Sequence, residues 1–298
     1  MKVLLAEALG LCFGVREALE VARRIERPTE ITVRGELAHN PLVNRELVGR
    51  GFVVVAERDE VATPGVLVTA HGTSDRERVK LMMAGNRVID TTCPLVRRAH
   101  DAAVGLQREG FHVLVIGQRN HVEVRGFIED LESFDVLESS RDVRQWEQGK
   151  LGIITQTTCP ERDAMAIVER VRRMNAESEI RFVDTICQPT RDRQAALEKL
   201  LDEVDVLVVV GGRNSNNTRR LVRRALVRGV PSVHVEDVGE LEESLFWPGM
   251  VVGLTAGTST LPETIAAVKG KLEKFEIRNS KFEANSNIQM IETSLQCE

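Results

Sequence analysis

The sequence predicts an α/β protein made of three similar α/β modules with mainly parallel sheets. Short apolar runs rich in Val, Ile and Leu alternate with amphipathic runs along almost the whole 298-residue chain. Continuous apolar strands are typical of parallel sheets buried on both faces, and regular strand–helix alternation is typical of parallel connections. A faint internal repeat supports several modules, because residues 88–93 read VIDTTC and residues 182–187 read FVDTIC. Common α/β punctuation is the alternative explanation of this repeat.

Twelve segments have the composition and length of buried strands. They lie at residues 2–8, 30–34, 51–57, 65–70, 87–90, 112–117, 134–137, 151–156, 180–184, 206–211, 232–236 and 251–255. Helices are predicted between them, and the run 15–25 has one apolar face. Pro94 and Pro189 stand just inside two predicted helix starts, where a missing N–H is tolerated.

The strand order and the repeat predict how the chain divides. An N-terminal strand with a first module, two further modules and a tail are expected at residues 1–92, 93–186, 187–275 and 276–298. The three modules would begin near three of the cysteines, whose ends would meet at a central cavity. The tail is polar and weakly patterned.

Composition excludes several classes of protein. The net charge is −5, so no basic field favours nucleic acid or an anionic membrane. The longest apolar runs, such as 206–210, are far shorter than a membrane span, and Glu7 interrupts any signal-peptide core. We therefore expect a cytoplasmic protein, in which cysteines stay reduced and serve metals or catalysis more often than disulfides.

Three cysteines carry the strongest signal. Cys12, Cys93 and Cys187 each stand where an apolar strand ends and a helix begins. The positive end of a helix favours the thiolate, which is the form that binds metal. Three thiolates would leave one iron of a four-iron cluster without a protein ligand. Cys159 and Cys297 have weaker contexts, and no role is predicted for Cys297.

Three histidines share a second position. His39, His71 and His121 come at or just after strand ends, where loops of parallel sheets face the ligand crevice. Three imidazoles there would neutralise a phosphate or diphosphate. For each alone, a surface or capping histidine is the alternative. The remaining three are interpreted as structural: His100, His112 and His234.

Three loops rich in hydroxyl and amide groups follow strands, at residues 155–158, 214–218 and 255–259. Such loops at helix starts bind anions without large positive charge, and plain N-capping is the alternative. Glu123, two residues after His121, would carry protons beside the same cavity. An exposed glutamate at a helix start is the alternative there.

Other enzyme classes lack their signatures. No G-x-G-x-x-G follows a strand, and G-x-x-x-x-G-K-[ST] and G-x-S-x-G are absent from the sequence. The absence of a C-x-x-C pair weakens a structural zinc site.

Together the motifs resemble those of the IspH (LytB) family of 4-hydroxy-3-methylbut-2-enyl diphosphate reductases. The resemblance extends to about residue 275. Its motifs are GLCFGV at Cys12, HNPLV at His39, AHG at His71, DTTCPLV at Cys93 followed by His100, NHVEV at His121, QTT at Thr157, DTIC at Cys187, NSNN at Ser215–Asn217 and TAGTS ending at Ser259.

The resemblance implies one [4Fe-4S] cluster per chain, bound by Cys12, Cys93 and Cys187, with its fourth iron open to substrate. It also implies three α/β modules about a pseudo-threefold axis, around a central cluster cavity. The implied reaction is a two-electron reductive dehydration of 4-hydroxy-3-methylbut-2-enyl diphosphate to isopentenyl and dimethylallyl diphosphate, in the non-mevalonate isoprenoid pathway. Ferredoxin or flavodoxin would supply the electrons.

The resemblance also implies roles for individual side chains. Glu123 and Thr157 would relay protons near the substrate alcohol. The residues implied in diphosphate binding are His39, His71, His121, Ser215, Asn216, Asn217 and Ser259, with Asn216 standing where the family usually has serine.

The chain departs from the family pattern at three further positions, namely Arg125, Thr258 and Cys159. A paralogue that acts on a related allylic diphosphate is therefore an alternative. A non-catalytic cluster-bearing diphosphate sensor and a zinc protein with the three cysteines and one histidine are the others.

Overall fold

The computed structural model describes residues 1–57 and 59–275, and within them twelve strands form three four-stranded sheets. Every strand pair in these sheets is parallel. The predicted α/β class with three similar modules is therefore confirmed. The predicted tail at 276–298, which contains Cys297, lies outside the described residues.

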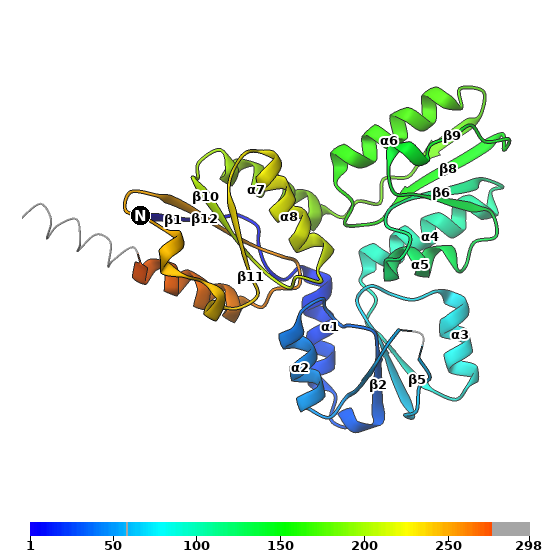
Figure 1. The fold of residues 1–298 in the computed structure, drawn as a ribbon. Helices are drawn as coiled ribbons and strands as arrows, with labels where there is room; N and C mark the ends of the chain where they lie inside the picture. The colour runs from blue at the N-terminus through cyan, green and yellow to red at the C-terminus, as the bar shows by residue number, and fades with distance from the viewer. Residues whose placement is uncertain (58, 276–298) are drawn as a thin grey trace, which may run out of the picture. The chain divides into compact units, whose positions relative to one another are not determined.

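The first sheet has the strand order β3-β2-β4-β5. Its strands are β2 (Ile31–Arg34), β3 (Val53–Val55), β4 (Gly65–Val68) and β5 (Arg87–Asp90). Its helices are α1 (Phe13–Arg24), α2 (Pro41–Gly49) and α3 (Asp75–Met83). Helices α1 and α2 lie on one side of the sheet and α3 on the other (Figure 1). The side chain of Asn40 accepts a hydrogen bond from the Leu42 N–H and so starts α2 directly after His39.

The second sheet has the order β7-β6-β8-β9. Its strands are β6 (His112–Ile116), β7 (Phe134–Leu137), β8 (Lys150–Thr155) and β9 (Glu179–Phe182), and its helices are α4 (Pro94–Arg108), α5 (Val122–Ile128) and α6 (Glu161–Met174). Alternate residues of β6 serve two cores. Leu114 and Ile116 pack with α6, whereas Val113 and Val115 pack with α4 and α5 on the opposite face (Figure 1).

The third sheet has the order β1-β12-β10-β11. Its strands are β1 (Lys2–Leu5), β10 (Val206–Val210), β11 (Ser232–Val235) and β12 (Val251–Ala256). Helices α7 (Gln188–Leu201) and α8 (Asn216–Val227) pack with Leu207 and Val209, and the helix over residues 262–275 packs with the opposite core. The first strand pairs with β12, so it completes the third sheet instead of adjoining the first module.

The chain forms two compact units. The second unit, Cys12–Arg191, contains the first two sheets. The described part of the first unit comprises residues 1–11 and 192–275 and contains the third sheet. The exact module boundaries predicted from the sequence stay predictions. Among the described residues, no helix combines the length and apolar character that a membrane crossing requires.

Candidate functional site

The three predicted cysteines all belong to the second unit and all stand at helix starts. Cys12 is the N-cap of α1, Cys93 is the N-cap of α4, and Cys187 immediately precedes α7. Each is partly exposed. A Cβ atom built on Gly14 would come within 2.6 Å of Cys93 Sγ. The first turn of α1 therefore lies against Cys93, and the absence of a side chain at Gly14 leaves room for the sulfur.

The thiols interact electrostatically with one another and with Glu123. Burial raises the pKa of Cys93, and the charges of Cys12 and Glu123 raise it further. Burial also raises the pKa of Cys187, with the same two charges acting in the same direction. A cation at these sulfurs would reverse the effect, because metal coordination deprotonates a thiol. The donor set therefore suits a positively charged metal centre.

Thr157 connects Glu123 to the third cysteine. Its backbone N–H donates to Glu123 Oε1 at 2.6 Å, and its carbonyl accepts from the Cys187 N–H at 2.9 Å. Glu123 is 2% exposed and Thr157 is 3% exposed. Glu123 is therefore not the exposed glutamate that the sequence left as an alternative, and its carboxylate is fixed close to the thiols.

The three predicted histidines form one cluster within the second unit. The ring centroids of His39 and His71 are 4.8 Å apart in a stacked arrangement. The His121 ring stands edge-on to both, with centroids 5.9 Å from His39 and 5.8 Å from His71. Three imidazoles from three separate strand-to-helix loops thus meet at one place, as the sequence predicted.

Hydrogen bonds and burial set the protonation of this cluster. His121 Nδ1 accepts from the Glu123 N–H at 3.2 Å, so a neutral His121 carries its proton on Nε2. His39 Nδ1 lies 2.8 Å from a carboxylate oxygen of Glu36. Burial lowers the pKa of His71 well below 6.5, and the neighbouring His39 and His121 lower it further. An anion at the cluster would oppose this effect and favour the charged imidazoles.

A further group in the second unit has ligand-type side chains, and sequence reasoning missed it. One ligand atom from each of Asp75, His100 and Asp130 lies within 4.8 Å of the others. Asp130 already accepts from the Asp75 and Arg76 N–H groups and contacts His100 Nε2 at 2.8 Å. Arg97 binds Asp75 at 2.8 Å. We interpret this group as a hydrogen-bonded ion-pair network, because its oxygens are already engaged by protein donors.

The chain's departures from the family pattern have structural explanations. Arg125 forms an ion pair with Glu57, so a carboxylate from the first sheet's module neutralises the unusual charge on α5. Cys159 is 5% exposed and packs in the apolar core with Leu114 and Ile167. A thiol in aliphatic surroundings is inert, so Cys159 is a core residue.

Two of the histidines interpreted as structural have such contacts. His112 lies between Ser133 Oγ at 2.8 Å and Asp135 Oδ2 at 3.0 Å. His234 Nε2 lies 2.8 Å from the Gly211 carbonyl oxygen. His100 differs from them, since it belongs to the network around Asp130.

The predicted hydroxyl and amide loops of the third module lie in the first unit. Ser215 is the N-cap of α8, and its hydroxyl accepts from the Thr218 N–H at 3.3 Å. The Asn217 Nδ2 atom is buried without a hydrogen-bond partner. A Cβ on Gly257 would overlap the Thr218 side chain, so the second loop, which ends at Ser259, packs directly on the start of α8. A buried amide donor without a partner is costly and is the kind of group that an anion satisfies.

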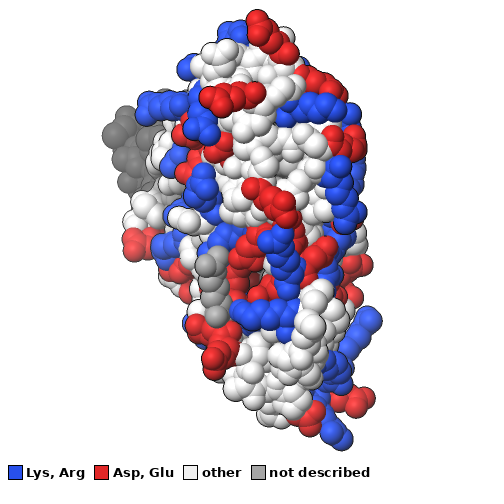
Figure 2. Space-filling model, turned by 90° about the vertical axis from the view of Figure 1, so that its right-hand side faces the viewer, with Lys and Arg blue, Asp and Glu red and all other residues white. Residues whose placement is uncertain are grey.

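The structure therefore gathers the predicted site residues in two sets. The second unit holds Cys12, Cys93, Cys187, His39, His71, His121, Glu123 and Thr157, and the first unit holds Ser215, Asn216, Asn217 and Ser259. Charged side chains of both signs are interspersed over the face shown in Figure 2. The fold and these sets define a class: an α/β protein whose thiols suit a metal centre and whose imidazoles and amides suit an anion.

Comparison with known proteins identifies the family. The model of the LytB protein family matches residues 3–273. The 4-hydroxy-3-methylbut-2-enyl diphosphate reductase of Dictyoglomus turgidum is 36% identical over 90% of this chain and 96% of its own length. The corresponding protein of Aquifex aeolicus is 32% identical, with coverage of 91% and 96%. The chain belongs to the LytB family.

Solved structures agree with this assignment. The E-1-hydroxy-2-methyl-but-2-enyl-4-diphosphate reductase from Plasmodium falciparum matches with a TM-score of 0.83 at 27% identity, covering 91% of this chain and 87% of its own. A second structure, described as (E)-4-hydroxy-3-methyl-but-2-enyl diphosphate reductase, the terminal enzyme of the non-mevalonate pathway, matches with a TM-score of 0.68 at 33% identity. It covers 92% of this chain and 100% of its own.

Proposed function

We propose that this protein is an oxidoreductase that converts 4-hydroxy-3-methylbut-2-enyl diphosphate to isopentenyl and dimethylallyl diphosphate in the non-mevalonate isoprenoid pathway. The observation that carries the proposal is the arrangement in the second unit of a LytB-family chain. Partly exposed thiols at helix starts lie close to a buried carboxylate, and that carboxylate's helix begins at one of three clustered imidazoles. A metal centre, an acid and an anion site are the three parts that this reaction requires.

Cys12, Cys93 and Cys187 would hold a [4Fe-4S] cluster, one per chain. The space over Gly14 beside Cys93 Sγ and the mutual effects on the thiol pKa values support this assignment. When bound, such a cluster supplies electrons and a Lewis-acid iron, because three protein thiolates leave one iron open. Ferredoxin or flavodoxin would be the electron donor, and the protein would act in the cytoplasm, where thiols stay reduced.

His39, His71 and His121 would bind the diphosphate, together with Ser215, Asn216, Asn217 and Ser259. A diphosphate carries enough negative charge to raise the pKa values of three adjacent imidazoles toward the protonated form. The His71 ring, whose pKa is low without an anion, would gain most from this change. Holding the substrate at its diphosphate end would fix the position of its hydroxyl group, which lowers the entropic cost of the reaction.

Glu123 and Thr157 would move protons. The dehydration consumes two electrons and two protons: one proton leaves with the hydroxyl oxygen as water, and one is added to carbon. Glu123 is the candidate acid because it is buried and close to the thiols. Its oxygen accepts from the Thr157 N–H, which holds the carboxylate in one orientation.

The direct test is anaerobic reconstitution with iron and sulfide, followed by an assay with reduced methyl viologen and the hydroxylated diphosphate. We expect a brown protein with broad visible absorption that forms both products. A colourless protein that retains stoichiometric zinc would contradict the cluster assignment. A brown protein that binds the diphosphate without turnover would contradict the enzymatic function and indicate a sensor. Reduction of another allylic diphosphate in preference to this one would indicate a paralogue.

The proton role of Glu123 has its own test. Glu123→Gln keeps the side-chain size and the oxygen that accepts from Thr157 but removes the proton source. We expect kcat to fall by roughly 10²–10⁴-fold with little change in KM. Unchanged turnover would remove Glu123 from the mechanism.

A further inference from the structure

Asp130 joins the two modules of the second unit through a cap on α3. It lies two residues after α5, and its side chain is 7% exposed. Its carboxylate accepts from the Asp75 N–H at 2.6 Å and from the Arg76 N–H at 3.1 Å. These are two of the N–H groups that a helix start leaves without intrahelical partners. A carboxylate from the second sheet's module thus completes the start of a helix in the first.

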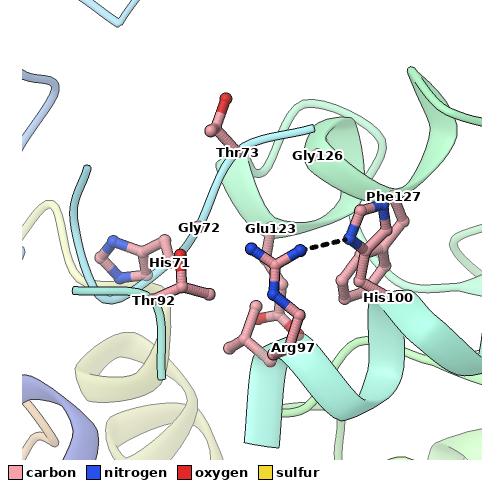
Figure 3. A pocket seen from close by; sticks show the side chains of 10 residues that line it. His71, Gly72, Thr73, Thr92, Arg97, His100, Glu123, Gly126 and Phe127 are labelled. Carbon is pink, nitrogen blue, oxygen red and sulfur yellow. Dashed lines mark hydrogen bonds between the residues drawn. The ribbon is translucent and has the colours of Figure 1, made fainter. Parts of the chain in front are cut away.

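His100 holds the same carboxylate from α4. Its Nε2 lies 2.8 Å from Asp130 Oδ2, and its Nδ1 lies 3.4 Å from an Arg97 nitrogen, as the dashed line in Figure 3 marks. Because arginine can only donate, Nδ1 accepts and Nε2 carries the proton that Asp130 accepts. The His100 ring stacks on Phe127 of α5, with centroids 6.0 Å apart. His100 is therefore fixed on both edges and on one face.

This connection lies beside the proposed catalytic groups. A small pocket, with room for about one water molecule, is lined by both His100 and Glu123. His71, Gly72 and Thr73 line the opposite side of the same pocket (Figure 3). A Cβ on Gly126 of α5 would come within 3.6 Å of the Thr73 Cα atom, so α5 packs directly on the loop that carries His71.

We infer that Asp130 and His100 are positioning residues: they fix the His71 loop against α5 and so set where His71 stands relative to His121 and Glu123. The inference rests on the proposed function, because it assigns meaning to the distance between a diphosphate ligand and an acid. α5 contributes His121 and Glu123 at its start and is followed by Asp130. The segment before α3 contributes His71, and α3 receives the Asp130 cap. The cap and the proposed site are thus opposite ends of the same pair of elements.

Asp130→Asn tests the inference. Asparagine keeps the shape, but its amide group faces a donor where Asp130 presented an oxygen. We expect normal iron and sulfide content, a kcat lowered by roughly tenfold and a several-fold weaker affinity for inorganic diphosphate by calorimetry. The matched control is Asp135→Asn, since Asp135 also accepts from a buried histidine, His112. The control should lose a similar amount of thermal stability and retain wild-type kcat and diphosphate affinity.

A double-mutant cycle distinguishes positioning from general destabilisation. If Asp130 acts through Glu123, then Asp130→Asn in the Glu123→Gln background should lower the residual kcat by less than about twofold. Equal losses of kcat in both backgrounds, or equal losses in Asp130→Asn and Asp135→Asn, would overturn the inference. If Asp130→Asn does not fold, His100→Gln and His100→Leu replace it. The glutamine variant, which keeps an N–H donor, should retain more activity than the leucine variant, and equal activities would overturn the inference.

The proposed function can fail independently of this inference. The wild-type protein and Glu123→Gln test the function, whereas the comparison between Asp130→Asn and Asp135→Asn tests positioning. Inorganic diphosphate affinity needs no turnover. A wild-type protein that binds diphosphate but reduces nothing therefore contradicts the function and still allows the weaker binding by Asp130→Asn to be measured.

Discussion

At the scale of single residues, two opposing effects act on the thiols. A helix start favours the thiolate, whereas burial and nearby negative charge raise the pKa values of Cys93 and Cys187. A metal centre resolves the conflict, because coordination outweighs both effects. The same reasoning separates Cys159, which lies among aliphatic side chains where a metal has no access.

Serine substitutions test this division among the cysteines. Cys12→Ser, Cys93→Ser and Cys187→Ser should each lose or degrade the cluster, because a hydroxyl is a poor iron ligand at neutral pH. Cys159→Ser is the control and should keep iron and sulfide content near that of the wild type, with a modest loss of stability from the buried hydroxyl. Full iron and sulfide content in the Cys187→Ser protein would refute the ligand assignment.

The histidine cluster makes stability depend on pH with a defined sign. The pKa of His71 in the folded state is lower than its unfolded value near 6.5. Above pH 7 the ring is neutral in both states and has no effect. As the pH falls below 6.5, the unfolded state binds a proton that the folded state excludes, so the free energy of unfolding decreases.

Chemical denaturation at pH 7.5 and 5.5, without diphosphate, measures this effect. Wild type should lose about 1 kcal/mol more than His71→Gln over this interval, since glutamine does not titrate. Addition of inorganic diphosphate should reduce the difference, because the anion favours the charged ring. An equal loss in both proteins would contradict the assignment of the low pKa to His71.

Residue types and positions predicted most of the site but not the network behind it. His39, His71 and His121 could be grouped because each follows a strand, and parallel strands bring such loops together. His100 could not be grouped with them, because its partner Asp130 is 30 residues away and follows a short helix. A carboxylate that caps a helix 54 and 55 residues earlier leaves no pattern in the sequence.

At the scale of elements, the contact between α1 and Cys93 depends on a glycine. The Cβ of an alanine at Gly14 would come within 2.6 Å of Cys93 Sγ, so either α1 or the sulfur must move. Gly105 of α4 is a matched control, since a Cβ there meets nothing within 4 Å. Both positions are inside helices, where alanine is otherwise favoured over glycine.

The two alanine substitutions should therefore differ in sign. Gly105→Ala should stabilise the protein by about 0.5–1 kcal/mol and leave cluster content unchanged. Gly14→Ala should lower the iron and sulfide content on reconstitution, because it displaces a ligand. Thermal unfolding and metal analysis of both proteins measure these changes. Full cluster content in Gly14→Ala would show that the sulfur has other room to move.

The strands were predictable because their burial is uniform. β10, for example, is buried at every residue, and a continuous apolar run is what a central parallel strand requires. The partner of a strand is less predictable, since an apolar run does not encode its neighbour. β1 pairs with β12, about 250 residues later, and no local pattern in either strand indicates this.

At the scale of the whole molecule, the proposed diphosphate ligands are divided between the two compact units. The imidazoles belong to the second unit, and Ser215, Asn217 and Ser259 belong to the first. If the loops of the first unit take part in binding, diphosphate should stabilise the protein through them as well. The buried Asn217 Nδ2 atom, which has no partner in the protein, is the group whose desolvation a bound oxyanion would compensate.

Asn217→Ala tests the participation of the first unit, with Ser232→Ala as control. Ser232 Oγ is also buried without a partner, but it lies in β11 and outside the predicted loops. In the absence of ligand, both variants should unfold at temperatures close to that of wild type, because neither loses a protein hydrogen bond. With inorganic diphosphate, wild type and Ser232→Ala should gain the same increment in unfolding temperature. Asn217→Ala should gain less, by the equivalent of roughly 1–2 kcal/mol of binding free energy. An undiminished increment in Asn217→Ala would confine diphosphate binding to the imidazoles of the second unit.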